Sequence, residues 1–308
     1  MPEVSVLLPV RDGARTLALA LLSVLQQSFR NFELLLLDDG SADASAEIAQ
    51  RFGDARVRLL RDGRQLGLAA RLNQGIDAAQ GRYIARMDAD DVCFPERFAR
   101  QVARLDNEPA LDLLACRVLE FDDSGAATGL RPSRLSHEAL CARPWNGFYL
   151  AHPSWMGRAD WFRRYRYRTP ELARAQDQEL LLRAYAHSRF AVLDEILLGY
   201  RAGPTALRKV WSARRYLLAA QFSQFAQHRQ FGNLLLAALA TGVKLPLDLM
   251  FAAPPGRWWQ ERRRATVPAE IDRAWSGLML SLCHRLNELN LPHGRECEDL
   301  LKAPANAH

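Results

Sequence analysis

The sequence lacks a regular pattern of cysteines. Its 308 residues include five, an odd number, and no two of them form a C-x-x-C pair. This count argues against a disulfide framework and against a structural zinc site. We therefore expect all five thiols to be reduced and mostly buried: Cys93, Cys116, Cys141, Cys283 and Cys297.

Glycine-rich phosphate loops are also absent. No G-x-G-x-x-G follows the first apolar run, and no G-x-x-x-x-G-K-[ST] occurs in the chain. A nucleotide would therefore have to be held in another way, for example through a divalent metal. The opening MPEVSVLLPV has no basic segment before its apolar run, unlike a signal peptide, so we expect a cytoplasmic protein.

The net charge of +6 is unevenly distributed. Residues 1–203 hold 27 Lys plus Arg and 27 Asp plus Glu, whereas residues 204–308 hold 14 against 8. A balanced N-terminal region argues against nucleic-acid binding as the role of the main domain. The basic C-terminal part fits nucleic acid, an anionic lipid surface, an acidic partner, or a solvated face without a partner.

Apolar runs of strand length alternate with segments of helical period in the first third of the chain. Continuous hydrophobicity in the strands is typical of a parallel sheet covered on both faces, so we predict a doubly wound α/β fold. The predicted strands are 4–10, 32–39, 57–62 and 82–88, and the predicted helices are 15–27, 42–52, 68–79 and 95–105.

The rest of the chain is less regular. Residues 111–123, 150–158 and 189–201 read as further strands and 177–187 as a helix, which predicts a mixed sheet. Beyond residue 204 the strands stop and the pattern is helical. We predict a catalytic domain at 1–203, with halves 1–106 and 107–203, and a basic helical extension at 204–308.

Three predicted strands end in polar clusters, and the carboxyl ends of parallel strands are where such sheets bind ligands. In the cluster RMDADD, alternation sends Asp88 and Asp90 to one side and Asp91 to the other. Two carboxylates on one side can share a hard divalent cation. The alternative for Asp91 is that it caps the helix that follows.

The cluster DDGSAD follows the second strand. A carboxylate here can accept the imide N–H of a uracil-type base, while Gly40 permits a sharp turn. Ser41 and Asp43 can cap the next helix, and turn-and-cap chemistry alone explains them as well. It does not explain both carboxylates before the glycine.

Four stretches, in order, resemble the successive motifs of glycosyltransferase family 2, whose enzymes have the GT-A fold. They are VSVLLPVRDG, LLLLDDGSAD, GLAARLNQGIDAAQGRYIARMDADD followed by PERF, and AQDQELLLR, and the match runs from about residue 4 to about residue 201. The resemblance implies an inverting transferase that moves a sugar from a nucleotide-diphosphate sugar, with UDP as the expected nucleotide, to a saccharide or lipid-linked acceptor. Polysaccharide, lipopolysaccharide or cell-envelope assembly would be its setting.

The resemblance also implies roles for individual residues. Asp90 would be the principal ligand of Mn²⁺ or Mg²⁺ and Asp88 a ligand of metal or ribose, with Arg86 near the departing diphosphate. Asp38 would read the base with Asp39 nearby. The remaining residues of the implied nucleotide site are Pro9, Arg11, Asp12, Arg71 and Asn73.

The acceptor side rests on the fourth motif. Asp177 would be the catalytic base, with helix capping as the alternative role. Gln176 stands where the family usually has Glu, and Gly203 stands where many relatives carry a metal-binding His. His152 would line the sugar pocket or serve as a structural hydrogen-bonding residue. These departures leave a second hypothesis open, a non-catalytic sugar-nucleotide-binding or scaffold protein of the same fold, and a third, nucleotidyl transfer.

The C-terminal part lies outside the resemblance. Its most apolar stretch is interrupted by Lys244, Pro246 and Asp248, which argues against a membrane-spanning helix and favours one that lies on a membrane. Trp258 and Trp259 beside an arginine cluster fit contact with anionic lipid at the inner face of the plasma membrane, or packing onto the catalytic domain.

Overall fold

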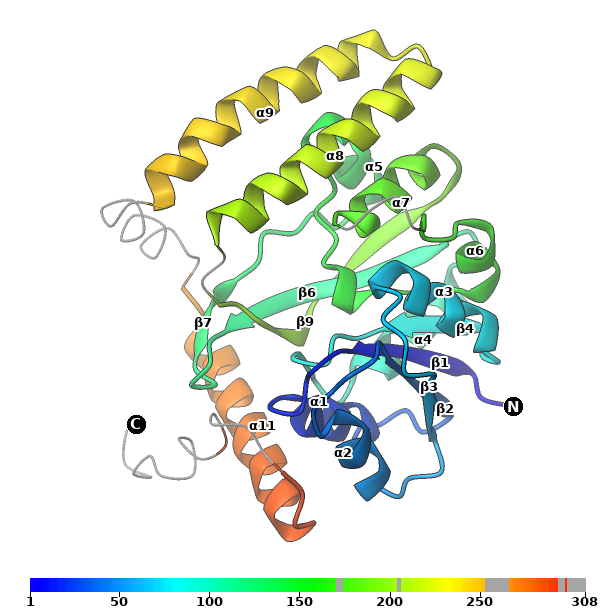
Figure 1. Ribbon diagram of the computed structural model, residues 1–308, viewed down its shortest axis with the longest axis vertical. Coiled ribbons are helices and arrows are strands. Elements are labelled where there is room, and N and C mark those ends of the chain that lie inside the picture. The colour runs from blue at the N-terminus through cyan, green and yellow to red at the C-terminus, as the bar shows by residue number, and fades with distance from the viewer. Residues whose placement is uncertain (170–173, 204–205, 253–265, 293–296, 298–308) are drawn as a thin grey trace.

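The structure is a computed structural model that describes residues 1–169, 174–203, 206–252, 266–292 and 297 (Figure 1). Trp258 and Trp259, and the lipid contact predicted for them, lie outside the described residues. Within the described part, nine strands form one sheet in the order β3-β2-β1-β4-β8-β6-β9-β5, with β7 paired to β6. The predicted mixed α/β sheet is confirmed.

The first four long strands are parallel, as their unbroken hydrophobicity predicts. They are β1 (Val4–Val10), β2 (Phe32–Asp38), β3 (Val57–Arg61) and β4 (Tyr83–Arg86). Both faces of β1 are buried: Val6 and Leu8 pack with α1 (Leu17–Leu25), whereas Leu7 packs with α3 (Leu68–Ala78). The remaining crossover helix is α2 (Ser45–Arg51).

The second half extends the same sheet with both orientations. β8 (Met156–Arg158) is antiparallel to β4 and β6, whereas β6 (Leu113–Phe121) and β9 (Phe190–Arg201) are parallel to each other. Two short strands complete the sheet, β5 (Val92–Cys93) on β9 and β7 (Ala127–Leu130) on β6.

Short helices connect these strands. The α-helices are α4 (Arg97–Asn107), α5 (His137–Cys141), α6 (Ala159–Arg164) and α7 (Gln176–Ala184), and the 3₁₀ turns are η1 (Pro144–Asn146), η2 (His152–Ser154) and η3 (Tyr185–His187). Helices α4 and α7 match predicted segments, whereas α5 and α6 were not predicted because each is a single short turn or two.

The C-terminal part divides into two structural groups. Helices α8 (Leu207–Gln227) and α9 (Phe231–Ala252) form a hairpin along one edge of the molecule, with α9 outermost (Figure 1). Helix α11 (Ala269–Glu288) instead packs beside α1, and its Trp275 is buried against Phe121, with the indole nitrogen donating to the Gly125 carbonyl at 2.8 Å. This helix therefore shares one hydrophobic core with the strands of the sheet.

The cysteine prediction is wrong for one pair. Cys283 on α11 and Cys297 form a disulfide, with Cα atoms 5.2 Å apart. Cys297 lies against the helix, a contact that the sequence spacing did not predict. The other three are free thiols, and Cys93 and Cys116 are buried as expected.

Helix α9 continues through Pro246 without a break. By length and composition, the segment Phe231–Met250 could cross a membrane, and only 6% of the segment is buried in the protein. Lys244, Pro246 and Asp248 therefore do not exclude a membrane-spanning helix on the ground of composition.

Candidate active site

Two adjoining pockets lie at the carboxyl end of β1 and β4. The larger, of about 580 Å³, is lined by Arg86, His152, Gln176 and Asp177 among others. The smaller, of about 330 Å³, is lined by residues that include Pro9, Arg11, Asp12 and Asp90. Asp88 lines both pockets. Nine of the predicted site residues, Asp88 included, therefore line one or both of these pockets.

Three carboxylates meet between the pockets. Asp88, Asp90 and Asp91 each offer an oxygen, and these oxygens lie within 4.8 Å of one another. The prediction that Asp91 points away is wrong, because β4 ends at Arg86 and strand alternation does not extend to these residues. The helix-capping role for Asp91 is also wrong, since α4 begins at Arg97 after Glu96.

Asp91 is instead held as part of the cluster. Its Oδ1 accepts the backbone N–H of Arg201 at 2.9 Å, while its buried Oδ2 has no hydrogen-bond partner among the residues that the structure describes. Burial, followed by repulsion from Asp88 and Asp90, raises the pKa of Asp91 well above its usual range. Burial and repulsion from Asp88 raise the pKa of Asp90. Carboxylates that repel one another, one of them with an unpartnered oxygen, are a suitable donor set for a divalent cation.

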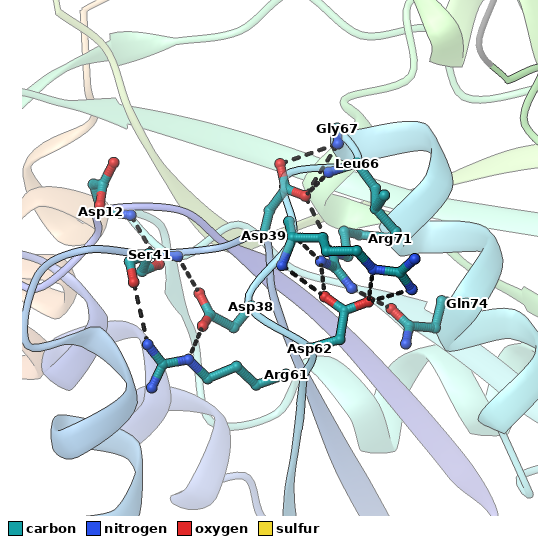
Figure 2. A network of polar contacts seen from close by, with 11 residues as sticks. Asp12, Asp38, Asp39, Ser41, Arg61, Asp62, Leu66, Gly67, Arg71 and Gln74 are labelled. Carbon is teal, nitrogen blue, oxygen red and sulfur yellow. Dashed lines mark hydrogen bonds and ion pairs between the residues drawn. The ribbon is translucent and has the colours of Figure 1, made fainter.

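The smaller pocket is shaped by the turn after β1. Asp12 has a left-handed backbone, with φ of 49°, and its N–H donates to the Ser41 hydroxyl at 3.0 Å (Figure 2). Asp38 accepts the backbone N–H of Ser41 at 3.0 Å and pairs with Arg61 at 3.0 Å. Asp38 thereby positions Ser41, and Ser41 positions the Asp12 turn. Gly40, with φ of 73°, makes the predicted sharp turn.

Asp39 and Arg71 form a second part of this network, outside both pockets. The fully buried Arg71 guanidinium donates to Asp39 at 3.1 Å and to Asp62 at 2.6 Å (Figure 2). Asp39 also accepts the backbone N–H groups of Leu66 at 2.7 Å and Gly67 at 3.0 Å. The network fixes the loop that enters α3, and a direct contact of Arg71 with nucleotide stays a prediction.

Arg86 forms the floor of the larger pocket. One of its terminal nitrogens pairs with Asp88, whereas its buried Nε and Nη1 have no hydrogen-bond partner among the residues that the structure describes. Guanidinium nitrogens without a partner keep the capacity to donate to an oxyanion. The place of Arg86 beside a diphosphate stays a prediction.

Asp177 lies at the start of α7, after Ala175, whose φ is 59°. The predicted N-cap role is wrong, because Asp177 is the second residue of α7 and Ala175 is its N-cap. Burial raises the pKa of Asp177, against the opposing hydrogen bonds from Gln178 and the charge of Arg86. A carboxylate with a raised pKa accepts a proton more readily near neutral pH.

His152 belongs to a hydrogen-bonded chain. Its Nε2 is 2.7 Å from the Tyr167 hydroxyl, and Asn73 holds the Tyr167 backbone through bonds of 2.8 and 3.1 Å. Burial and the nearby Arg86 lower the pKa of His152 well below its usual range, so the ring is neutral at pH 7. Asn73 therefore acts on the larger pocket through Tyr167 and lines neither pocket.

Sequence reasoning missed several pocket residues. Arg15 and Arg201 line the smaller pocket and both pair with Asp123, at 2.9 and 3.4 Å. Arg131 and Tyr200 line the larger one and stack with a guanidinium-to-ring distance of 3.9 Å. The Tyr-Arg pair at 200–201 was a usable signal, since it lies two residues before Gly203, the position compared with a histidine ligand.

Comparisons with known proteins agree with this geometry. The sequence model described as "Glycosyl transferase family 2" matches residues 5–166. The EpsE protein of Bacillus subtilis (strain 168), named as a glycosyltransferase, is 32% identical over 214 residues, which cover 68% of this chain and 76% of EpsE. The succinoglycan biosynthesis protein ExoO of Rhizobium meliloti (strain 1021) is 37% identical over 106 residues, which cover 34% of this chain and 30% of ExoO.

Two solved structures share the fold. TarS of S. aureus, in complex with UDP-GlcNAc, has a TM-score of 0.58 and 15% identity, covering 97% of this chain and 89% of that one. The mannosyltransferase PcManGT of Pyrobaculum calidifontis, in complex with GDP-Man and Mn²⁺, has a TM-score of 0.56 and 16% identity, covering 91% and 87%. At these identities the likeness shows the fold, and the predicted GT-A fold is confirmed.

Proposed function

Because the chain belongs to glycosyl transferase family 2, we propose that it transfers a sugar from a nucleotide-diphosphate sugar to a saccharide or lipid-linked acceptor, with inversion at the anomeric carbon. The observation that carries the proposal is the position of Asp88, which lines both the pocket with Asp12 and the pocket with Asp177. A donor that spans the two pockets would have its diphosphate at the acidic cluster. Exopolysaccharide or cell-envelope assembly, at the cytoplasmic face of the plasma membrane, is the proposed setting.

The smaller pocket is the proposed nucleotide site. Pro9, Arg11 and Asp12 line it, and Asp38 remains the proposed reader of the base, supported by its place next to the Asp12 turn. Arg71 and Asn73 are proposed as positioning residues, Arg71 through Asp39 and Asn73 through Tyr167 beside the larger pocket. Since the solved relatives bind UDP-GlcNAc and GDP-Man, UDP is tested against GDP below.

The acidic cluster is the proposed cation site. Asp88 and Asp90, with Asp91 added by the structure, would hold Mn²⁺ or Mg²⁺, and the unpartnered Oδ2 of Asp91 fits this use. When bound, the ion would neutralise charge on the diphosphate of the donor. The Mn²⁺ in PcManGT supports the metal, and its identity in this chain is part of the proposal.

Transfer requires a base on the acceptor side of the anomeric carbon. Asp177 takes the acceptor proton as the new glycosidic bond forms, and burial in the larger pocket supports this role. The unpaired N–H groups of Arg86 donate to the departing diphosphate. Neutral His152, fixed by Tyr167, and Gln176 line the sugar-binding wall.

Calorimetric titration with UDP and GDP, each with and without Mn²⁺, tests the donor site first. We expect metal-dependent binding of one nucleotide and, with the matching nucleotide sugars, release of nucleoside diphosphate on turnover. Asp177→Asn should retain nucleotide binding and lose transfer by about 10²- to 10⁴-fold, the usual range for loss of a general base. Unchanged turnover in this variant would remove Asp177 from the mechanism.

The scaffold hypothesis predicts a different result. It is motivated by Gln176 and Gly203, which replace a glutamate and a histidine expected in active relatives. A scaffold would bind nucleotide sugar with the same metal dependence and release no nucleoside diphosphate with any acceptor. Release of pyrophosphate instead would indicate nucleotidyl transfer.

A further inference from the structure

Helix α9 has a reversed distribution of polar and apolar side chains. Every exposed residue between Phe231 and Met250 is apolar or glycine. The exposed large residues recur at spacings of three and four, which places them on one face of the helix. We call this the outward face of α9: Leu235, Leu236, Leu239, Val243, Leu247 and Met250, exposed by 60, 41, 58, 61, 39 and 54%.

The two charged side chains of α9 turn toward the protein. Lys244 donates to the Asn146 side chain at 2.6 Å, and Asp248 accepts two bonds from Arg214 on α8, at 2.5 and 2.7 Å. A helix on a water-facing surface normally shows the opposite arrangement, with charges outward. The polar residues that interrupt the apolar stretch in the sequence therefore leave its outward face uninterrupted.

The exposed charges of the α8–α9 hairpin are all positive. Residues 206–252 contain one acidic residue, Asp248, which is bound to Arg214. The exposed charged residues are Arg208, Lys209, Arg215 and Arg229. Positive charge beside an apolar face complements an anionic lipid surface, whereas a second copy of the same hairpin would bring like charges together.

We propose that the outward face of α9 lies in the surface of an anionic membrane, with the basic residues of the hairpin at the lipid head groups. The helix lies on the membrane and does not cross it, because its opposite face is fixed to α8 and to η1 by Lys244 and Asp248. A crossing would bring both charged residues into hydrocarbon.

The hairpin also adjoins the wall of the larger pocket. Gln221 on α8 donates to the Pro144 carbonyl at 3.0 Å, and Gln178, next to Asp177, holds the Phe148 backbone at 2.8 and 3.2 Å. Residues 148–153 line that pocket. A lipid-linked saccharide in the same membrane is therefore the acceptor class that this placement favours, a consequence that rests on the proposed function.

The test is flotation of the full chain, purified without detergent, with vesicles of neutral phosphatidylcholine or of phosphatidylcholine with 30% phosphatidylglycerol. We expect binding to the anionic vesicles that falls with salt. Leu239→Glu with Val243→Glu should weaken the partition coefficient by about tenfold or more, because two inserted apolar side chains become charged. Arg208→Gln with Arg215→Gln should weaken it about fivefold for each charge on anionic vesicles only.

Leu280→Glu is the matched control, since Leu280 is an exposed leucine on α11, at 42% exposure. It should bind like the unmodified chain, and far-ultraviolet circular dichroism confirms folding of every variant. Absence of binding to both vesicle types overturns the proposal, as does an equal loss in Leu280→Glu. A dimer in solution that Leu239→Glu dissociates would assign the face to a second copy, and a chain released from vesicles only by detergent would assign α9 as a span. No nucleotide or sugar is present, so failure here is separate from failure of the proposed transfer.

Discussion

The chain places a pair of aspartates after β2 and a cluster of three after β4, and the two groups behave differently. Asp38 and Asp39 are each paired with an arginine, at 3.0 and 3.1 Å, and neither lines either of the two pockets described above. In the second group, burial followed by repulsion between carboxylates raises the pKa of Asp91, and burial with repulsion from Asp88 raises the pKa of Asp90. Acids paired with an arginine hold a loop, whereas acids that repel one another keep the capacity to bind a cation.

The largest expected effect separates the two groups by activity. Asp90→Asn should reduce glycosyl transfer by at least about 10³-fold, because it removes charge from the site where the diphosphate is stabilised. Calorimetry should show that Mn²⁺ no longer strengthens nucleotide binding. Asp54→Asn is the control, since Asp54 pairs with Arg56 at 2.7 Å outside both pockets. Metal-dependent binding that survives in Asp90→Asn would contradict the assignment of the cluster.

The paired group should respond in stability instead. Arg71→Met should lower the free energy of unfolding by about 3 kcal/mol, because it leaves Asp39 buried without its cation. Urea denaturation measures the change. Arg64→Met removes an exposed arginine bound to Asp62 at 3.0 Å and should stay within about 0.5 kcal/mol. Equal losses in the two variants would show that burial of Arg71 has no special weight.

Much of this contrast could be predicted from the sequence, but the arginine partner of each carboxylate could not. The hydrophobic runs predicted the parallel strands, and the rule for their carboxyl ends predicted that residues 38–39 and 88–91 lie at the same edge of one sheet. The partners Arg61 and Arg71 could not be predicted, because each comes from a different element and is selected by tertiary packing. Asp91 was misplaced because alternation was extended past the last residue of β4.

The C-terminal part was harder for a related reason. In the sequence, Lys244 and Asp248 interrupt the apolar stretch of α9. In the folded chain Lys244 donates a hydrogen bond to Asn146, and Asp248 pairs with Arg214. Likewise, a separation of 14 residues between two cysteines does not by itself predict that they pair. Local patterns predicted the elements, and contacts between elements distant in sequence decided the roles.

A third substitution should change the free energy of unfolding in the direction opposite to that of Arg71→Met. Asp91→Asn should raise the free energy of unfolding of the metal-free chain by about 1 kcal/mol, since it relieves repulsion and can keep the bond to the Arg201 N–H. The same variant should lose the stabilisation that Mn²⁺ gives the unmodified chain. Thermal unfolding with and without Mn²⁺ measures both effects, with Asp160→Asn, exposed by 96%, as the control. Destabilisation without metal would mean that Asp91 is compensated like the first group.

The smallest expected effect concerns the pH dependence of stability and Asp62, which shares its partner Arg71 with Asp39. The hydrogen bond from Arg71 is the main cause that lowers the pKa of Asp62. A carboxyl whose folded pKa is depressed stabilises the chain above its unfolded pKa of about 3.9, and this contribution is lost as pH falls below that value. Asp62→Asn should therefore be less stable than the unmodified chain at pH 7, with a difference that shrinks between about pH 5 and pH 2. In an Arg71→Met background the same substitution should have a smaller pH-dependent effect, because the largest cause of the shift is gone and only the hydrogen bonds from Arg64 remain. Urea denaturation across this pH range measures both comparisons, and a difference that stays constant with pH would separate Asp62 from the Arg71 network.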